Sequence, residues 1–331
     1  MDEEKPVSSR ATKRVLVIDY SQTGQLRRVW QQIIAPLEAA HDVEVRVETL
    51  VPQRPFPYPW SFFRFLDAFP ESAHMAPAPL QPLSLQGHER FDLVILPYQV
   101  WFLAPSQPMA AFLQHPVAAQ VLRDTPVVTV IACRNMWLRA HEKTQALLSA
   151  IGARLVDNVV LADPSPAVAS LVTTPRWMLT GRRDAFCGLP PAGLTEGQIK
   201  GARRFGEALL DGLRHDRETT GEPLLRGLGA VSANPALWFS ESVASRSFRA
   251  WGWLVRAAGE PGHWRRRPVL AVYAVFLVAM VFTVVPISLL AQRLLRPLLR
   301  RRLQAIQARF EQPSGSDGGE PTFFQPGGSH E

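Results

Sequence analysis

The chain has 331 residues, of which 47% are hydrophobic and 20% charged, with 36 Lys and Arg against 29 Asp and Glu. This apolar fraction excludes a wholly disordered protein, and the length allows one large domain with an appendage, or two domains. Cys133 and Cys187 are too few for a disulfide framework, and neither they nor the scattered histidines predict a metal site. No apolar stretch follows the charged start MDEEKPVSSR, so we expect no secretory signal.

Short apolar runs alternate with helical patterns between residues 13 and 216. Apolar runs predict strands over 14–19, 43–50, 91–98, 126–133 and 153–163. Helical spacing predicts helices over 26–40, 108–122, 138–153 and 197–214, the second interrupted by Pro116. Strands alternating with helices imply right-handed crossovers and a parallel sheet with helices on both faces. We therefore predict a doubly wound α/β domain with a five-stranded parallel sheet.

Two Pro-rich insertions, 51–90 and 164–196, lengthen this predicted domain. The first contains PFPYPWSFFRFLDAFPES at 55–72, which is rich in aromatic residues. Long connections of this kind are more often lids or binding loops than filler. We expect the first insertion to form a lid or a substrate wall, and packing over the sheet edge is the alternative.

The segment after the predicted domain, 217–264, is expected to be a linker followed by an amphipathic helix. Trp238, Trp251 and Trp253 alternate there with arginines, a pattern that fits a helix lying in a membrane interface. A helix packed on the domain fits the pattern equally well. Residues 1–12 are expected to be disordered, and 297–331 to be a basic and then disordered tail.

An uncharged stretch of 23 residues runs from Val269 to Ala291. At about 1.5 Å per residue it is long enough to cross a hydrocarbon core of about 30 Å. Arginines lie on both sides of it, at 265–267 and at 293–302, which suits anchoring at two headgroup layers. We predict a C-terminal transmembrane helix over 265–296, with a buried core helix as the alternative. Because the arginines gather around this stretch, no nucleic-acid partner is expected.

The turn between the first predicted strand and helix reads YSQTGQ, residues 20–25. Ser21 and Thr23 can donate to phosphate oxygens, and Gly24 lets the backbone approach closely. Backbone N–H groups and the helix dipole favour a phosphate at such a place. The pattern differs from the GxxxxGK[ST] and GxGxxG loops, so a nucleoside triphosphate or a dinucleotide is less favoured. A plain tight turn is the alternative.

With this turn, residues 13–214 resemble the flavodoxin-like superfamily, whose phosphate loop reads (Ser/Thr)-x-Thr-Gly-x-Thr and binds FMN. Ser21, Thr23 and Gly24 match the pattern, and Leu26 takes the place of the last hydroxyl. The resemblance implies FMN as the cofactor, in a pocket at the carboxyl ends of the strands. The cofactor-binding residues it implies are Ser21, Gln22, Thr23, Gly24, Gln25, Pro97, Tyr98, Gln99, Val100, Trp101, Cys133, Arg134, Asn135, Met136 and Trp137.

The flavin ring needs a flat apolar wall and polar groups along its pyrimidine edge. Tyr98, Trp101 or Trp137 could supply the wall, and Asn135 the polar edge. Arg134 would stabilise anionic reduced flavin or a substrate oxyanion, so Arg134 and Asn135 are the expected catalytic residues. The loop after the third strand is similar to that of flavin-dependent quinone reductases, which makes NAD(P)H a candidate reductant.

A narrower resemblance involves YSQTGQL, PFPYPW, CRNMW, WMLTG and the C-terminal apolar stretch. Together they are similar to the bacterial dialkylresorcinol condensing enzymes. This implies an inner-membrane oxidoreductase with its domain in the cytoplasm, acting on an apolar aromatic or acyl-thioester intermediate of dialkylresorcinols or aryl polyenes. One alternative is a cofactor-free scaffold for ketosynthases, and another is a condensing enzyme using Cys133 or Cys187. A homodimer is expected by analogy alone.

Overall fold

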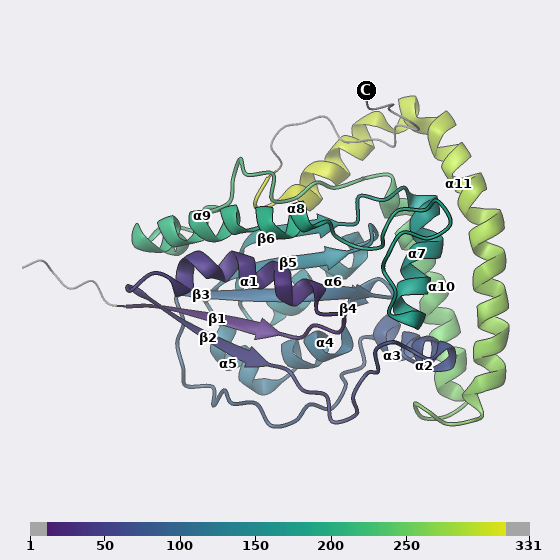
Figure 1. Ribbon diagram of the computed structural model, residues 1–331, viewed down its shortest axis with the longest axis horizontal. Coiled ribbons are helices and arrows are strands. Elements are labelled where there is room, and N and C mark those ends of the chain that lie inside the picture. Colours follow the sequence, from purple (N-terminus) through teal and green to yellow (C-terminus); the bar gives the residue numbers. More distant parts are fainter. Residues whose placement is uncertain (1–11, 316–331) are drawn as a thin grey trace, which may run out of the picture.

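A computed structural model describes residues 12–315, without the side chains of 284–298; the predicted disordered ends fall largely outside this range. Its main sheet has five parallel strands, β1 (Lys13–Asp19), β2 (Val43–Thr49), β3 (Leu93–Trp101), β5 (Pro126–Cys133) and β6 (Arg154–Ala162). Their spatial order is β2-β1-β3-β5-β6 (Figure 1). This is the strand order of flavodoxin-like doubly wound sheets, so the predicted α/β class is confirmed.

A sixth strand is added to these five parallel strands, so the sheet of the described residues has six strands and the expected total of five is corrected. The sixth, β4 (Ala104–Pro105), pairs antiparallel with Val100 and Trp101 of β3. The chain reverses between them through Phe102 and Leu103, whose φ angles are 49° and 60°. A strand of two residues shows no periodicity, which is why the pattern could not reveal it.

Helices cover both faces of the sheet. One face packs against α1 (Gln25–Glu38), α8 (Glu196–Gly201) and α9 (Arg203–Arg214). The other packs against α4 (Gln107–Leu113), α5 (Pro116–Leu122) and α6 (Leu138–Ala150). Successive residues of β1 alternate between these two cores, as the pleat of a strand requires. The break at Pro116 is confirmed, while the single predicted helix 197–214 is two helices that meet at Ala202.

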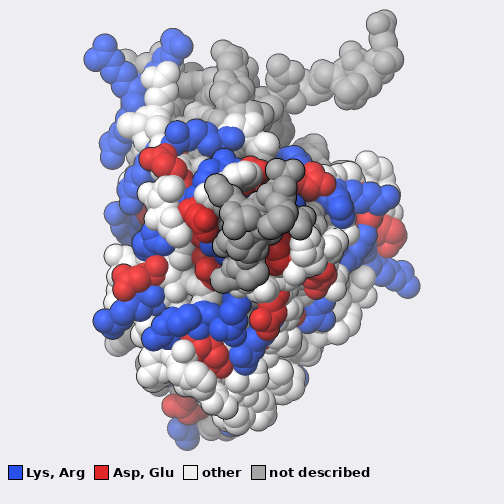
Figure 2. Space-filling model, turned by 90° about the vertical axis from the view of Figure 1, so that its left-hand side faces the viewer, with Lys and Arg blue, Asp and Glu red and all other residues white. Residues whose placement is uncertain are grey.

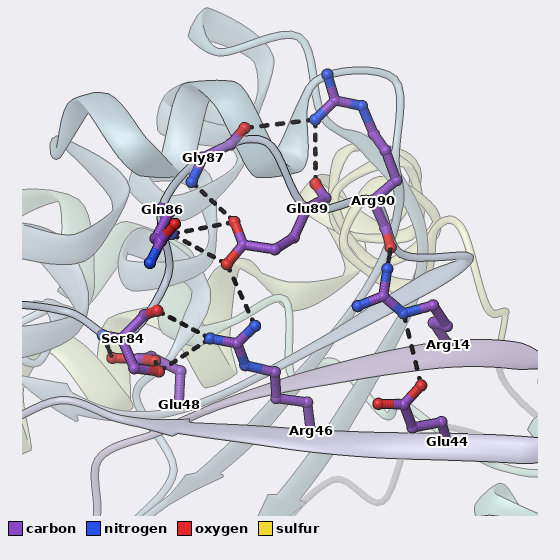
Figure 3. A network of polar contacts seen from close by, with 9 residues as sticks. All are labelled: Arg14, Glu44, Arg46, Glu48, Ser84, Gln86, Gly87, Glu89 and Arg90. Atoms are coloured by element: carbon purple, nitrogen blue, oxygen red, sulfur yellow. Dashed lines mark hydrogen bonds and ion pairs between the residues drawn. The ribbon is translucent and has the colours of Figure 1, made fainter.

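The first insertion forms two short helices, α2 (Phe62–Asp67) and α3 (Phe69–His74), beside the carboxyl ends of the strands (Figure 1). Its return path is fixed to β2 by a polar network (Figure 3). Within that network, the Ser84 N–H donates to Glu48 at 3.0 Å, and Arg46 donates to Glu89 at 3.2 Å. The last part of the insertion is therefore attached to β2, the strand from which the insertion departs.

The second insertion contains a regular element that the sequence did not predict, α7 (Ala167–Thr180). This helix includes Pro175 within its length, and other prolines precede it closely. Prolines ordinarily end helices, so their density concealed the helical pattern.

The rest of the chain returns to the domain and then leaves it. A 3₁₀ turn, η1 (Arg217–Thr219), is followed by a segment that runs along β6, where the Val160 N–H donates to Ala230 at 2.8 Å. Helix α10 (Leu237–Ala257) packs against α3, α6 and α11. Helix α11 (Arg266–Glu311) contains a stretch, Arg266–Thr283, that is long and apolar enough to cross a membrane by length and composition.

Candidate functional site

The loop after β1 lies at the switch point of the sheet, because β2 and β3 flank β1 on opposite sides. Ligands of doubly wound folds bind at this point, outside the carboxyl ends of the strands. Gly24 precedes α1 with φ 80°, a left-handed conformation that glycine adopts without steric cost. Among the described residues, apart from Gly24 itself and its two chain neighbours, no atom lies within 4 Å of the position that a Cβ of Gly24 would take. The loop therefore leaves open space at the start of a 14-residue helix.

The two predicted hydroxyl groups are directed at the first turn of α1. Ser21 Oγ accepts from the Arg27 N–H at 3.3 Å, and Thr23 Oγ1 accepts from the Gln25 N–H at 3.4 Å. Bonds of this length are weak, and these N–H groups are donors that a phosphate at the helix start would use. An anion can thus replace the hydroxyl contacts at small cost.

The two glutamines of the loop hold it to other segments. Gln25 is buried, and its amide both accepts from the Leu194 N–H at 3.0 Å and donates to the Leu194 carbonyl at 3.3 Å. Gln22 donates to the carbonyl of Pro57 in the first insertion at 3.2 Å. Both side chains therefore position the loop rather than face an open site.

A buried carboxylate beside the loop was missed by the sequence analysis. Asp19 ends β1 and accepts from Trp30 Nε1 at 2.8 Å and from Arg27 Nε at 3.0 Å. Its charge is thereby balanced, which removes the repulsion that a bare carboxylate would exert on a phosphate. The acidic end of the apolar run RVLVID was the available signal. Leu26, at the place of the missing hydroxyl, is buried in the core under α1.

The alternation of β3 separates the residues of the second predicted loop. Tyr98 is fully buried in the core on the α6 side. By this alternation Gln99, one residue out of phase with Tyr98, points to the side of Leu93 and Ile95, which pack against α1. Trp101 lies at the end of the strand, where its ring contacts Tyr20 of the phosphate loop. Pro97 is also buried, and Val100 packs on the α6 side.

Gln99 has a side-chain amide without a hydrogen-bond partner. Both its nitrogen and its oxygen are buried and unpaired among the described residues. Buried polar atoms are ordinarily satisfied, and an exception often marks a missing ligand or water. The amide thus offers an N–H donor and an oxygen acceptor. Both lie on the same side of the sheet as Gly24.

Trp101 lies in a cluster of aromatic rings at the edge of the sheet. Its ring packs edge-on against Phe56 at 4.9 Å, Trp60 at 5.7 Å and Tyr20 at 6.0 Å between centroids. Phe56 and Trp60 belong to the first insertion, which therefore covers the ring of Trp101. Two open surface hollows, of about 500 and 470 Å³, lie elsewhere, next to Gln120 and Gln145.

The third predicted loop contains a cation next in the chain to a half-buried cysteine, Arg134 after Cys133. Arg134 Nε donates to Asn135 Oδ1 at 3.3 Å. Burial lowers the pKa of Arg134, and the carboxylate of Asp163 opposes that change. Burial raises the pKa of the Cys133 thiol well above its usual range, and the Glu241 carboxylate acts in the same direction. Cys133 is therefore held as a thiol, which disfavours a nucleophilic role.

The remaining residues of this loop turn inward. Trp137 is buried and packs edge-on against His141 and Phe310. Met136 is half-buried between Asn135 and Trp137. Of the three aromatic residues predicted as a ring wall, Tyr98 and Trp137 belong to the buried core on the α6 side, and Trp101 contacts Tyr20 of the phosphate loop.

No family model matches the chain, and no curated protein matches it either. Among solved structures, it is similar to a flavoprotein in complex with FMN from Lactobacillus acidophilus NCFM, at 15% identity and a TM-score of 0.35, over 45% of this chain and 93% of that one. A flavodoxin from the domain Archaea is 11% identical at a TM-score of 0.34, over 61% of this chain and 99% of that one. Both TM-scores are below 0.5, so these similarities carry no argument here, and the flavodoxin-like character of the fold follows from its own strand order.

Proposed function

We propose that this protein is a membrane-associated, flavodoxin-like oxidoreductase that binds FMN at the loop between β1 and α1. The observation that carries the proposal is the open space over Gly24 at the switch point of the sheet. Ser21, Thr23 and the first-turn N–H groups of α1 would hold the phosphate. When bound, FMN supplies two-electron redox chemistry at this edge.

The chain's residues fit the rest of the cofactor in part. The unpaired Gln99 amide offers the polar contacts that a pyrimidine edge needs, and Trp101 offers an apolar ring. Arg134 and Asn135 would stabilise negative charge on the reduced ring or on a substrate oxygen. Tyr98 and Trp137 have no part in this arrangement, because both are buried in the core.

The cover over the site supports the proposed substrate class. Phe56 and Trp60 form an apolar wall, and α2 and α3 connect this wall to the apolar helix α11. An aromatic or polyene lipid intermediate suits such a place, as in the oxidation of a ring to a dialkylresorcinol or an aryl polyene precursor. Oxidation of the ring would pass two electrons to the flavin and from it to an acceptor such as oxygen, whereas NAD(P)H would be the reductant if the substrate is reduced. A homodimer as the assembly belongs to the same proposal.

The test is FMN binding by Gly24→Ala, measured by quenching of flavin fluorescence in detergent. A Cβ there enters the phosphate space, so we expect affinity to fall about tenfold or more, the effect of one lost charge-assisted hydrogen bond. Gly221→Ala is the matched control, because Gly221 has φ 79° and open space around it as well. Both variants carry the same backbone strain of about 1 kcal/mol. Equal FMN affinity in the two variants contradicts the proposal.

The second candidate is a cofactor-free relative that presents this fold to ketosynthases. The aromatic cover on Trp101 and the burial of Leu26 favour it. This candidate predicts that the folded wild-type chain binds no FMN at all, whatever residue stands at position 24. The same titration on the wild-type protein therefore separates the two functions.

A further inference from the structure

Helix α11 returns to the domain from which it departs. It has 46 residues, which correspond to about 70 Å if the helix were straight. Figure 1 shows it passing along the side of the domain toward which the strands point and then folding back over the domain. Pro286 and Pro297 fall within it, and each removes a backbone hydrogen bond and favours a kink.

The start of α11 is fixed to the first insertion. Arg266 is 1% exposed and donates to Asp67 at 2.9 Å and to Glu71 at 2.6 Å. Two turns later, the ring of Tyr273 stacks on Phe69 with a centroid distance of 4.1 Å. The start of the apolar stretch is therefore attached to α2 and α3 by buried polar and aromatic contacts.

The end of α11 is fixed to the sheet by buried polar contacts. Ser314 is fully buried, and its hydroxyl accepts from the Asn158 N–H at 2.7 Å and donates to Asp157 at 2.8 Å. The Glu311 carboxylate accepts from the Ala233 N–H at 3.2 Å. These contacts involve the Asp157 carboxylate and the backbone N–H groups of Asn158 and Ala233, so they define one position for this end.

Apolar and ionic contacts complete the attachment of this end. Phe310 is 1% exposed and packs edge-on against Trp137 at 6.2 Å. Arg309 forms an ion pair with Glu142 of α6 at 3.0 Å. Residues 303–314 therefore belong to the globular domain as much as residues 266–273 do.

Both attachments cannot persist if the stretch between them crosses a bilayer. A crossing helix places its ends on opposite sides of a hydrocarbon core of about 30 Å. The partners of the two ends, Asp67 and Asp157, lie in one folded domain. Burying the charged surface of that domain in lipid would cost several kcal/mol for each charge. The apolar stretch must then leave and return on the same side.

The outward face of α11 carries an uncovered apolar stripe. Val272, Val275, Val278 and Phe282 are 59%, 72%, 56% and 75% exposed, and their spacing of three to four residues places them on one side of the helix. Leu270 and Tyr273 face the domain and are buried. An exposed apolar stripe of this kind marks a surface that contacts a membrane or a partner.

The surroundings of the stripe indicate what covers it. Trp264 and Trp253 are each 65% exposed, and Phe62 and Phe63 are half-exposed on α2, which packs on α11. Exposed arginines accompany them, at positions 64, 249, 256, 265 and 267. Aromatic rings and arginines are the residues that lie at the headgroup level of a membrane. The face opposite α11 instead carries closely mixed charges of both signs, as water-facing surfaces do (Figure 2).

We infer that α11 attaches this protein to a bilayer from one side only, with the stripe from Val272 to Phe282 in a single leaflet. Both ends of the helix then lie in the water on the side of the domain, and the arginines contact anionic headgroups. This inference deepens the membrane association of the proposed function and is independent of FMN. In place of the transmembrane helix expected from the sequence, it proposes a helix attached to one side of the bilayer, next to the carboxyl ends of the strands.

The first test counts labels on single molecules. A variant with Glu260→Cys before the stretch and Gln304→Cys after it, in a Cys133→Ala/Cys187→Ser background, is reconstituted in sealed vesicles of phosphatidylethanolamine and phosphatidylglycerol. A membrane-impermeant maleimide is added outside, and intact masses are measured. Both positions are exposed, so detergent must give two labels on every molecule.

One-sided attachment predicts molecules with two labels or with none, whatever the orientation in the vesicles. A crossing helix predicts one label on every molecule, and that result overturns the inference. Flotation of the same vesicles checks that the protein is bound, and failure of the wild-type chain to float overturns the inference as well. FMN binding plays no part in either readout, so the proposed function can fail separately.

The second test asks whether the stripe meets lipid. Val275→Asp should lower vesicle partitioning about tenfold or more, because a carboxylate in the hydrocarbon costs several kcal/mol. Val51→Asp is the control, since Val51 is 50% exposed beyond the end of the edge strand β2. Equal flotation of the two variants overturns the inference. A further outcome would be a protein that does not bind vesicles but forms a dimer in detergent, which Val275→Asp dissociates. That result assigns the stripe to a second copy of the chain and overturns the inference too.

Discussion

Glu241 is a buried carboxylate that caps a helix to which it does not belong. It lies on α10 and accepts from the N–H groups of Leu138 at 3.3 Å and Arg139 at 2.7 Å, the first two of α6. These N–H groups have no partner within their own helix, and a carboxylate at a helix start is favoured by the dipole. Burial nevertheless dominates and raises the pKa of Glu241 to about 7.

Replacing Glu241 by Gln should change how stability depends on pH. The folded state holds a proton on Glu241 more tightly than the unfolded state, whose pKa is near 4.5. Wild-type stability therefore falls as pH rises through the window from about 4.5 to about 7. Glu241→Gln lacks this loss, so the variant should gain about 3 kcal/mol relative to wild type between those limits. Urea unfolding at a series of pH values measures the difference.

A control separates this effect from general charge removal. Glu207 is exposed and paired with Arg203 on α9, so Glu207→Gln should leave the pH profile parallel to that of wild type. His141, whose pKa burial lowers to about 4, gives the opposite pH dependence but is present in every variant and cancels in the comparison. If the profile of Glu241→Gln also runs parallel to wild type, Glu241 does not titrate in this window.

Local sequence located the residues of the phosphate loop, but not their partners. Ser21, Thr23 and Gly24 follow β1 as predicted, because a strand, a turn and a helix are read from neighbouring residues. Tyr98 was assigned to the ring wall because the sequence placed it in a loop expected to form the pocket. The sequence did not show to which face of the sheet its side chain points. Glu241 gave no signal at all, since the groups it caps lie 103 and 102 residues away in the chain.

At the scale of elements, one glycine sets the distance between two helices. Gly206 of α9 faces α1, and a Cβ there would lie 1.8 Å from the carbonyl oxygen of Ile33. Because that oxygen is backbone, the contact can be relieved only by moving a whole helix. We expect Gly206→Ala to lower the free energy of unfolding by about 3 kcal/mol or more, measured by urea denaturation.

The matched control is Gly197→Ala on α8. A Cβ at Gly197 would meet nothing closer than Thr195 Oγ1 at 3.9 Å. Alanine is the better helix former, so this variant should be unchanged or more stable by up to about 1 kcal/mol. If Gly206→Ala is as stable as Gly197→Ala, the close approach of α1 and α9 is not rigid.

Periodicity was enough to predict the parallel strands and the main helices, because each buries one face and repeats over several residues. It failed where an element is too short or carries breakers. Two-residue β4 has no period, and α7 contains Pro175. The single helix predicted over 197–214 is divided at Ala202, directly after Gly201, which is a weaker helix breaker than proline.

At the scale of the molecule, the transmembrane helix was predicted from composition alone, and composition does not record which residues the flanks of a helix contact. A window of apolar residues records length and charge, and Arg266–Thr283 satisfies both criteria. It contains no information on where the flanks bind. The contacts of Ser314 with Asp157 and Asn158 span 157 and 156 residues, and only the folded chain reveals them.

The two ends of α11 should therefore respond differently from its middle when phenylalanines are truncated. Phe310 is buried against Trp137, so Phe310→Ala should leave a cavity and cost about 3 to 4 kcal/mol of unfolding free energy in detergent. Phe282 is 75% exposed, so Phe282→Ala should change stability by less than about 0.5 kcal/mol under the same conditions.

Denaturant unfolding followed by tryptophan fluorescence measures both variants. A small effect of Phe310→Ala would mean that residues 303–314 are not part of the core. The end of α11 could then lie on the other side of a bilayer from the domain, as in a transmembrane helix. A large effect means that deleting α11 uncovers the core around Trp137. Loss of activity in a truncated chain would then report unfolding rather than detachment from the membrane, and variants on the outward stripe are needed to separate the two.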